Sequence, residues 1–166
     1  MRITVRLVAL LAVCAAGALL LVGCGGGDRP CADLLDDFCG IYENMPAGQR
    51  YVSGAAEWEK GYLSPTLADV LFCEDNGENA FSLCAEYAIF LSSSREGGEI
   101  AFLRAGGTDE AERLSDMCAA RIARVRRVMQ NADILQEACV LRNGHDVILL
   151  LLPDNARAKE ICQKLY

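Results

Sequence analysis

The chain has 166 residues, with 16 Lys and Arg against 23 Asp and Glu, a net charge of −7, nine cysteines and one histidine. This acidic balance argues against electrostatic binding to nucleic acid and against adhesion to an anionic lipid surface by charge. We therefore expect no nucleic-acid partner.

The first 23 residues have the organisation of a bacterial export signal. Arg2 and Arg6 precede the uncharged run Leu7–Val22, whose 16 residues are fewer than the roughly 20 of a membrane-spanning helix. The junction Leu21-Val22-Gly23-Cys24 resembles the lipobox of bacterial lipoproteins. That resemblance implies cleavage after Gly23 and attachment of acyl chains such as palmitate to Cys24. The alternatives are an uncleaved N-terminal anchor, or ordinary cleavage that leaves Cys24 as a plain thiol.

A lipid on Cys24 predicts a protein held on the extracytoplasmic face of the cell membrane. Each buried methylene contributes about 0.8 kcal/mol, so two or more acyl chains give stable anchoring. Residues 24–30, which include Gly25–Gly27, form the expected flexible tether. Loss of residues 1–23 leaves 143 residues with 14 cations against 23 acids, a net charge of −9. We expect residues 31–166 to form a single α+β domain with a genuine core.

The N-terminal part of this domain predicts two short helices. An apolar stripe that runs from Cys31 to Tyr42 has the period of a helix, and Pro30 suits its first turn. Residues 44–62 show no sustained period, which predicts an irregular connection. Ser64 and Pro65 then have the positions of an N-cap and a first helical residue, so a second helix is expected up to Phe72.

The C-terminal half, residues 84–166, predicts a doubled ββα unit. Asn143-Gly144 lies between two apolar runs, which is the strongest short signal for a tight hairpin. Val147–Leu152 has no polar alternation, which is typical of a central strand covered on both faces. The expected elements are strands 84–91 and 99–104, a helix from 108 or 109 to about 130, strands 138–142 and 145–152, and a last helix that begins near Asp154.

These elements predict an α+β fold of two layers. Four mostly antiparallel strands form the sheet, the two long helices of the doubled unit cover one face, and the short N-terminal helices support it.

The order of these motifs resembles that of a known family. Glu99-Ile100-Ala101-Phe102 precedes a long helix that contains Arg121, and the second hairpin ends in Val147–Leu151. This arrangement is similar to the clostridial lipoproteins known as domain of unknown function 4358, in which the long helix often carries a basic residue. The resemblance covers about residues 84–166 together with the signal and tether. Since that family has no established activity, the resemblance implies a source and a cellular address and no reaction.

Seven cysteines remain besides Cys24 and the signal-sequence Cys14. An odd number leaves at least one thiol unpaired even in an oxidising compartment, and no CxxC pair points to a zinc knuckle or a thioredoxin-type site. Two interpretations stay open, buried thiols that act as small hydrophobic side chains and a disulfide framework. The seven are Cys31, Cys39, Cys73, Cys84, Cys118, Cys139 and Cys162.

Catalytic and metal-binding signatures are missing from the sequence. His145 follows the Asn143-Gly144 turn, where a solvated polar residue is expected, and the spacing supplies no further metal ligands for it. No GxSxG, Walker, GxGxxG or HExxH motif occurs. We therefore expect no enzymatic activity, no cofactor and no metal.

Two groups of residues are the remaining candidates for a role. Ser92, Ser93, Ser94 and Arg95 form a loop tip that we interpret as a possible contact loop. Arg121 lies near the buried side of the long helix, where Glu99 or another acid is expected to hold it in an ion pair. The function that these observations favour is a non-catalytic binding or scaffold module at the cell envelope, for an unknown protein or envelope component. The alternative is an extracytoplasmic thiol or disulfide protein.

Overall fold

The computed structural model describes residues 29–73, 77, 79–94, 97–129 and 133–166. The predicted signal, Cys24, most of the tether and Arg95 lie outside the described residues. Within these ranges, no helix is both long enough and apolar enough to cross a bilayer.

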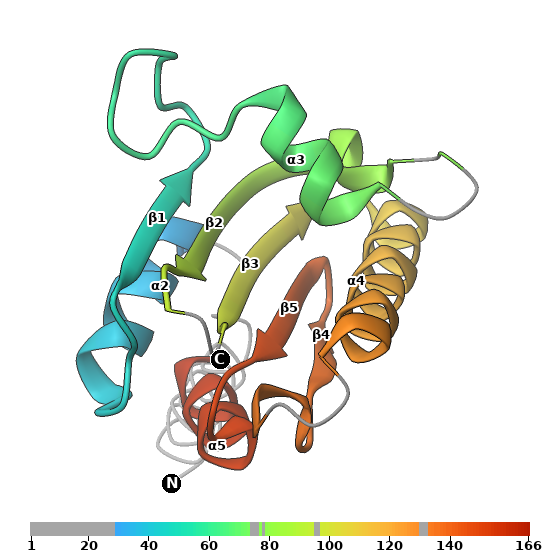
Figure 1. Cartoon of the computed structure of the whole chain (residues 1–166). Helices are drawn as coiled ribbons and strands as arrows, with labels where there is room; N and C mark the ends of the chain where they lie inside the picture. The colour runs from blue at the N-terminus through green and yellow to red at the C-terminus, as the bar shows by residue number, and fades with distance from the viewer. Residues whose placement is uncertain (1–28, 74–76, 78, 95–96, 130–132) are drawn as a thin grey trace, which may run out of the picture.

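Among the described residues, five antiparallel strands form one open sheet in the order β1-β2-β3-β5-β4, and four α-helices pack on it (Figure 1). The fold is thus α+β, as the sequence predicts. The elements in chain order are α2 (Cys31–Ile41), β1 (Gly48–Val52), α3 (Pro65–Phe72), a 3-10 turn (Ala80–Leu83), β2 (Cys84–Ser92), β3 (Glu99–Ala105), α4 (Thr108–Val128), a second 3-10 turn (Asp133–Leu135), β4 (Cys139–Asn143), β5 (Asp146–Leu151) and α5 (Asn155–Leu165).

Helices cover both faces of the sheet, so the predicted two-layer arrangement is wrong. Helices α3 and α4 pack on one face, against side chains such as Leu103 and Leu149. Helices α2 and α5 pack on the other face, against the alternate side chains such as Phe102 and Ile148. All six residues of β5 are buried, because a strand in the middle of such a sheet is covered from both sides. The predicted central strand Val147–Leu152 therefore occupies the expected place.

The fifth strand, β1, lies within residues 44–62, which the sequence pattern predicts to be irregular. Its Gly48, Gln49 and Arg50 are exposed, and it pairs only with β2 at the edge of the sheet. An edge strand of this kind needs no apolar alternation, so the period that identifies a half-buried strand is missing. The sheet consequently has five strands where the sequence predicts four.

The predicted hairpin between the last two strands is present, with its turn one residue later than expected. Asn143 pairs with Asp146, which makes Gly144 and His145 the two central residues. Only Gly144 of this pair has a positive φ, +60°, as a glycine at the first central position of a two-residue turn can adopt.

The helix boundaries follow local signals in the sequence. The Ser64 hydroxyl accepts a hydrogen bond from the Leu67 N–H at 3.2 Å, and Asp154 accepts one from the Arg157 N–H at 2.9 Å. Both contacts satisfy amide groups of a first helical turn. Along α4, Leu114 and Cys118 of the apolar stripe are fully buried, so the charged face of this helix is directed toward solvent.

Candidate functional site

Glu99 and Arg121, which the sequence places as a possible ion pair, meet beneath α4. Glu99 begins β3, is 4% exposed, and accepts two hydrogen bonds on Oε2, from Arg121 Nε at 3.1 Å and Nη2 at 2.9 Å. Its other oxygen, Oε1, is buried and makes no hydrogen bond. Burial raises the pKa of Glu99, and the charge of Arg121 opposes that shift. The pair is therefore buried and only partly satisfied.

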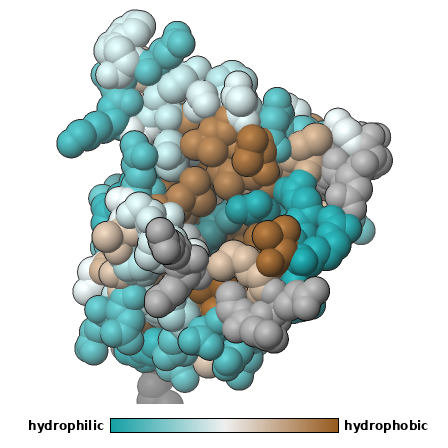
Figure 2. All heavy atoms as spheres, viewed as in Figure 1, coloured by the Kyte–Doolittle hydropathy of each residue, from teal (hydrophilic) through white to brown (hydrophobic). Residues whose placement is uncertain are grey.

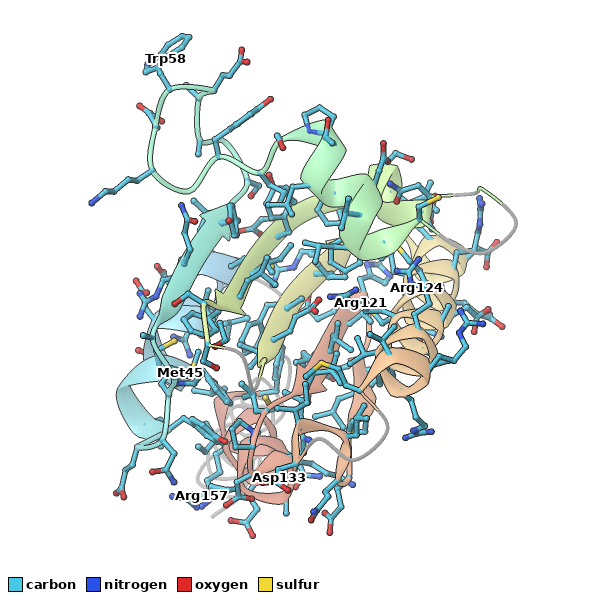
Figure 3. All side chains as sticks on the ribbon, viewed as in Figure 1. Met45, Trp58, Arg121, Arg124, Asp133 and Arg157 are labelled. Atoms are coloured by element: carbon cyan, nitrogen blue, oxygen red, sulfur yellow. The ribbon has the colours of Figure 1, made fainter. Side chains whose placement is uncertain are left out.

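Arg124 lies one helical turn after Arg121 on the same side of α4. Its guanidinium donates a hydrogen bond to the Leu71 carbonyl oxygen in the last turn of α3, where backbone carbonyls lack helical partners. Figure 3 shows Arg121 and Arg124 extending from α4 across the front of the sheet. Arg121 thus contacts the carboxyl group of Glu99 directly, Arg124 is bonded to α3, and the charge of each arginine favours the ionised form of Glu99.

The surface around these arginines is apolar. Leu91 of β2 pairs directly with Glu99 of β3, so the two side chains lie on the same face of the sheet, and Leu91 is half-buried. Leu67 of α3 and Val125 of α4 are also partly exposed at this side of the core. Figure 2 shows hydrophobic side chains gathered on this face around a hydrophilic patch. We name Glu99, Arg121, Arg124 and Leu91 the front-face cluster.

A second polar network, which the sequence reasoning missed, lies at the other end of β3 and on the opposite face. Arg104 donates to both oxygens of Asp146, from Nε at 2.7 Å and from Nη2 at 3.2 Å. It also contacts Glu86 Oε2 at 3.0 Å and the Arg29 carbonyl oxygen at 2.9 Å. The other oxygen of Glu86 accepts the Cys31 N–H at 2.7 Å. The network therefore joins the first described residues to the middle of the sheet.

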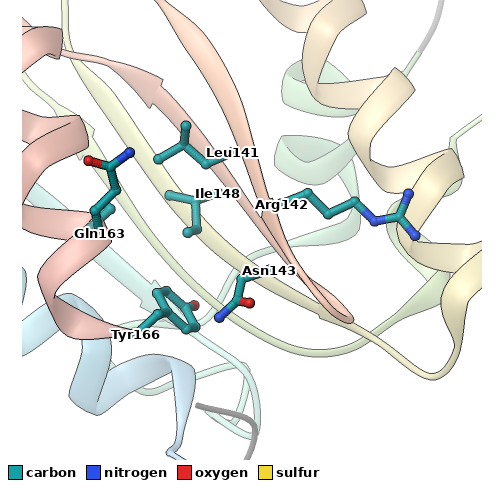
Figure 4. A pocket seen from close by; sticks show the side chains of 7 residues that line it. Leu141, Arg142, Asn143, Ile148, Gln163 and Tyr166 are labelled. Atoms are coloured by element: carbon teal, nitrogen blue, oxygen red, sulfur yellow. The ribbon is translucent and has the colours of Figure 1, made fainter. Parts of the chain in front are cut away.

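A pocket of about 330 Å³ opens between α5 and the edge strand β4 (Figure 4). Its floor is apolar, and amide and phenol groups of Asn143, Gln163 and Tyr166 stand at its side. The Tyr166 hydroxyl is buried beside the Asp146 carboxylate and outside hydrogen-bonding geometry, and burial, together with that charge, raises its pKa. The residues that line the pocket are Leu141, Arg142, Asn143, Ile148, Cys162, Gln163 and Tyr166.

The loop between β1 and α3 carries Trp58, the only tryptophan of the chain, at its tip (Figure 3). The side chain is 86% exposed. The loop is nevertheless ordered by its own hydrogen bonds, from Glu59 N–H to the Ala56 carbonyl at 2.8 Å, from Ala56 N–H back to Glu59 Oε2 at 2.9 Å, and from Val52 N–H to the Gly61 carbonyl at 2.9 Å. Sequence reasoning passed over this residue because a lone tryptophan in an aperiodic segment does not show whether it is buried.

The predicted contact loop is only partly described, since Arg95 lies outside the described residues. Ser92 Oγ donates to Ser94 Oγ at 2.9 Å, and Ser93 bonds the Ala47 carbonyl oxygen through both its N–H at 2.9 Å and its hydroxyl at 3.1 Å. These serine hydroxyls thus hold the turn against the segment that precedes β1.

None of the seven cysteines among the described residues takes part in a disulfide. Burial raises the pKa of the Cys31 and Cys162 thiols to about 12 and also raises the pKa values of Cys39, Cys84, Cys118 and Cys139. A thiol reacts as its thiolate, so these shifts make the six groups poor nucleophiles.

Within the described part of the chain, no three His, Cys, Asp or Glu side chains come together as a metal site, and His145 is exposed on its turn. No family model, curated protein or solved structure matches the chain. The resemblance to the clostridial lipoproteins of domain of unknown function 4358 therefore stays a prediction.

Proposed function

We propose that this chain is a membrane-anchored, extracytoplasmic lipoprotein whose domain is a non-catalytic binding module at the cell envelope. The anchoring part of the proposal rests on the charged start, the short apolar run and the lipobox-like residues that end in Cys24. The binding part rests on the surface of the domain.

Trp58 is the observation that carries the binding role. Exposure of the largely apolar indole to water is unfavourable, and tryptophan is among the residues that most often dominate the energy of protein interfaces. The loop hydrogen bonds of Ala56 and Glu59 hold the backbone around Trp58 in place before any partner arrives. Such preorganisation lowers the entropic cost of association. Trp58 therefore has the exposure and the rigid support of an interface anchor.

The charges beside Trp58 favour a protein over a lipid surface as its partner. Glu57 and Glu59 flank the indole, and Lys60 follows them. Two carboxylates next to the anchor repel an anionic membrane and attract a pocket whose rim is basic. The partner that this tip fits is a protein with an apolar pocket surrounded by Lys or Arg.

The buried thiols weigh against the alternative of a thiol or disulfide protein. Redox cysteines have depressed pKa values and accessible sulfur atoms. Cys118 is fully buried, and burial raises its pKa and that of its neighbour Cys84. The structure thus favours these thiols as packing groups.

Photocrosslinking in living cells tests the binding role. A benzophenone amino acid at position 58 is expected to give a discrete protein adduct, whereas the same group at Val128, which is 83% exposed on α4, gives none. The captured protein, once purified, should bind the Trp58→Ala chain at least about tenfold more weakly than wild type, as for an interface hot spot. Equal adducts from positions 58 and 128, or unchanged affinity of Trp58→Ala, would overturn the proposal.

Fatty-acid labelling tests the anchor separately. Cells fed a palmitate analogue should label the wild-type chain and retain it in the membrane fraction. The Cys24→Ala chain should carry no label, and a labelled Cys24→Ala chain would contradict the assignment of this residue.

A further inference from the structure

The front-face cluster has a charge balance unlike that of the whole chain. Arg121 and Arg124 contribute two positive charges beside the single carboxyl of Glu99, whereas the chain as a whole is acidic. With Glu99 ionised the cluster has a net charge of +1, and with Glu99 protonated it has +2. The site is therefore complementary to an anion.

The guanidinium groups also keep hydrogen-bond donors to offer. Each arginine has five N–H groups. Bonds to described residues use two of them in Arg121, both to Glu99 Oε2, and one in Arg124, to the Leu71 carbonyl. The side chain of Arg121 is 20% exposed, so part of it reaches the surface. An incoming carboxylate could thus accept hydrogen bonds from both arginines.

We propose that the front-face cluster binds a small amphipathic monocarboxylate, whose carboxylate contacts Arg121 and Arg124 and whose apolar part lies over Leu91. The cross-strand neighbour of Glu99 on this face is Leu91, which is half-buried and packs against the hydrophobic core on this face. Figure 2 shows that hydrophobic side chains gather on this face. With Glu99 ionised, the cluster has a charge of +1, which a single negative charge neutralises. A dianionic phosphate would leave an excess charge in a mainly apolar surrounding, which is costly.

Glu99 has a regulatory place in this site. Its Oε2 competes with the ligand for Arg121, while its Oε1 is buried without a hydrogen bond. The charged groups that act on Glu99 are Arg121 and Arg124, both on α4. The Cys118 thiol, also on α4, is a titratable group whose pKa is affected by Glu99. Its cross-strand neighbours, Leu91 and Leu151, are apolar. A neutral side chain at position 99 should therefore release Arg121 to the ligand.

Calorimetric titration with decanoate below its micellar concentration tests the proposal. The complete mature chain is used with Cys24→Ser, so that no acyl chain of its own competes. Wild type should bind decanoate, while Arg121→Gln and Arg124→Gln should each bind it at least about tenfold more weakly. Glu99→Gln should bind it about threefold or more tightly. The matched control is Arg126→Gln, which removes the same charge from the exposed side of α4 and should leave the affinity unchanged.

Three further probes separate the contribution of the carboxylate from that of the apolar chain. Decanol and acetate should both bind much more weakly than decanoate, because each lacks one half of the ligand. Decyl phosphate should bind less tightly than decanoate. The proposal is overturned by equal binding of decanol, by tighter binding of decyl phosphate, by a loss in Arg126→Gln equal to that in Arg124→Gln, or by no heat of binding in a wild-type chain with a cooperative unfolding transition.

This site is independent of the partner proposed for Trp58. The Trp58→Ala chain should bind decanoate as wild type does, since the loop tip points away from the sheet (Figure 3). Absence of a crosslinked partner for the wild-type chain, together with intact decanoate binding, would therefore refute only the first proposal. A crosslinked partner without decanoate binding would refute only the second.

Discussion

Strand β3 carries a charged residue near each end, and the two residues differ in how completely their polar atoms are hydrogen-bonded. Arg104, near its end, lies on the face covered by α2 and has hydrogen bonds to Asp146, Glu86 and the Arg29 carbonyl. Glu99, at its start, lies on the face covered by α4 and leaves one buried oxygen without a hydrogen bond. Networks that are fully satisfied stabilise a unique structure, whereas partly satisfied ones are costly and are retained at sites with another role.

The two networks connect different parts of the chain. The Arg104 network joins Arg29, near the end of the predicted tether, and Cys31, the first residue after it, to the centre of the sheet. It therefore secures the point at which the predicted anchor enters the domain. The Glu99 pair connects α4 to an otherwise apolar face, and tertiary packing already holds α4 there. We infer that the first network is structural and that the second contributes to binding.

Replacement of Arg104 is expected to have the largest effect on the free energy of unfolding. Asp146 is 4% exposed, and Arg104→Leu removes its partner, so the unpaired buried charge should lower the free energy of unfolding by about 3–5 kcal/mol. Urea denaturation measures this change. Arg157→Leu, which removes an exposed ion pair with Glu160, is the control and should cost less than about 1 kcal/mol. Similar losses in the two variants would show that the Arg104 network is no more structural than a surface pair.

A double-mutant cycle on Glu99 and Arg121 should give a smaller net effect. Arg121→Met alone leaves a buried carboxylate without its main partner and should lower the free energy of unfolding by about 2–4 kcal/mol. The double variant Glu99→Met with Arg121→Met should lie within about 1 kcal/mol of wild type, because apolar replacement of both partners removes the desolvation cost as well as the attraction. Urea denaturation of the four chains gives the coupling. A double variant as unstable as Arg104→Leu would make the two ends of β3 equivalent.

The pH dependence of stability sharpens the same comparison. Burial raises the pKa of Glu99 above its ordinary value of 4.5. The folded chain then holds this proton more tightly than the unfolded chain, so the contribution of Glu99 to stability is complete below pH 4.5 and is lost as the pH rises through the raised pKa. Glu99→Gln removes that loss. The stability of the variant relative to wild type should therefore increase from acid to neutral pH in parallel urea titrations, and a flat difference would contradict the raised pKa.

Much of the fold follows from local patterns, and the errors have identifiable causes. The two hairpins, the stripe of α4 and the capped helices α3 and α5 all combine a period with a start or stop residue. The edge strand β1 escaped prediction because Gly48, Gln49 and Arg50 are exposed. The number of layers was mispredicted because the sequence does not state which helix covers which face. The continuous apolar run Val147–Leu152 indicates only that both faces of its strand are covered.

The candidate site could be predicted only in part for a similar reason. Arg121 stands beside the buried stripe of α4, and Glu99 opens a strand, so a pairing between them could be anticipated from helix geometry. The hydrogen bonds of Arg104 to Asp146 and of Arg124 to the Leu71 carbonyl join residues that are 42 and 53 positions apart in the sequence. No local pattern reports such contacts, because they depend on strand order and on the face that each helix occupies.

The smallest expected effect concerns the hydroxyl of Tyr166, which is the buried atom without a hydrogen bond on the Arg104 side. If the Arg104 network is complete without it, Tyr166→Phe removes a desolvated polar group and no hydrogen bond, so the free energy of unfolding should change by less than about 1 kcal/mol or rise slightly. Thermal unfolding of the two chains measures the change, with Tyr42→Phe as the control, since the Tyr42 hydroxyl accepts a hydrogen bond from the Asp154 N–H at 3.0 Å and its removal should be destabilising. A loss in Tyr166→Phe larger than in Tyr42→Phe would show that the phenol supports Asp146, and the network around Arg104 would then extend to the end of the chain.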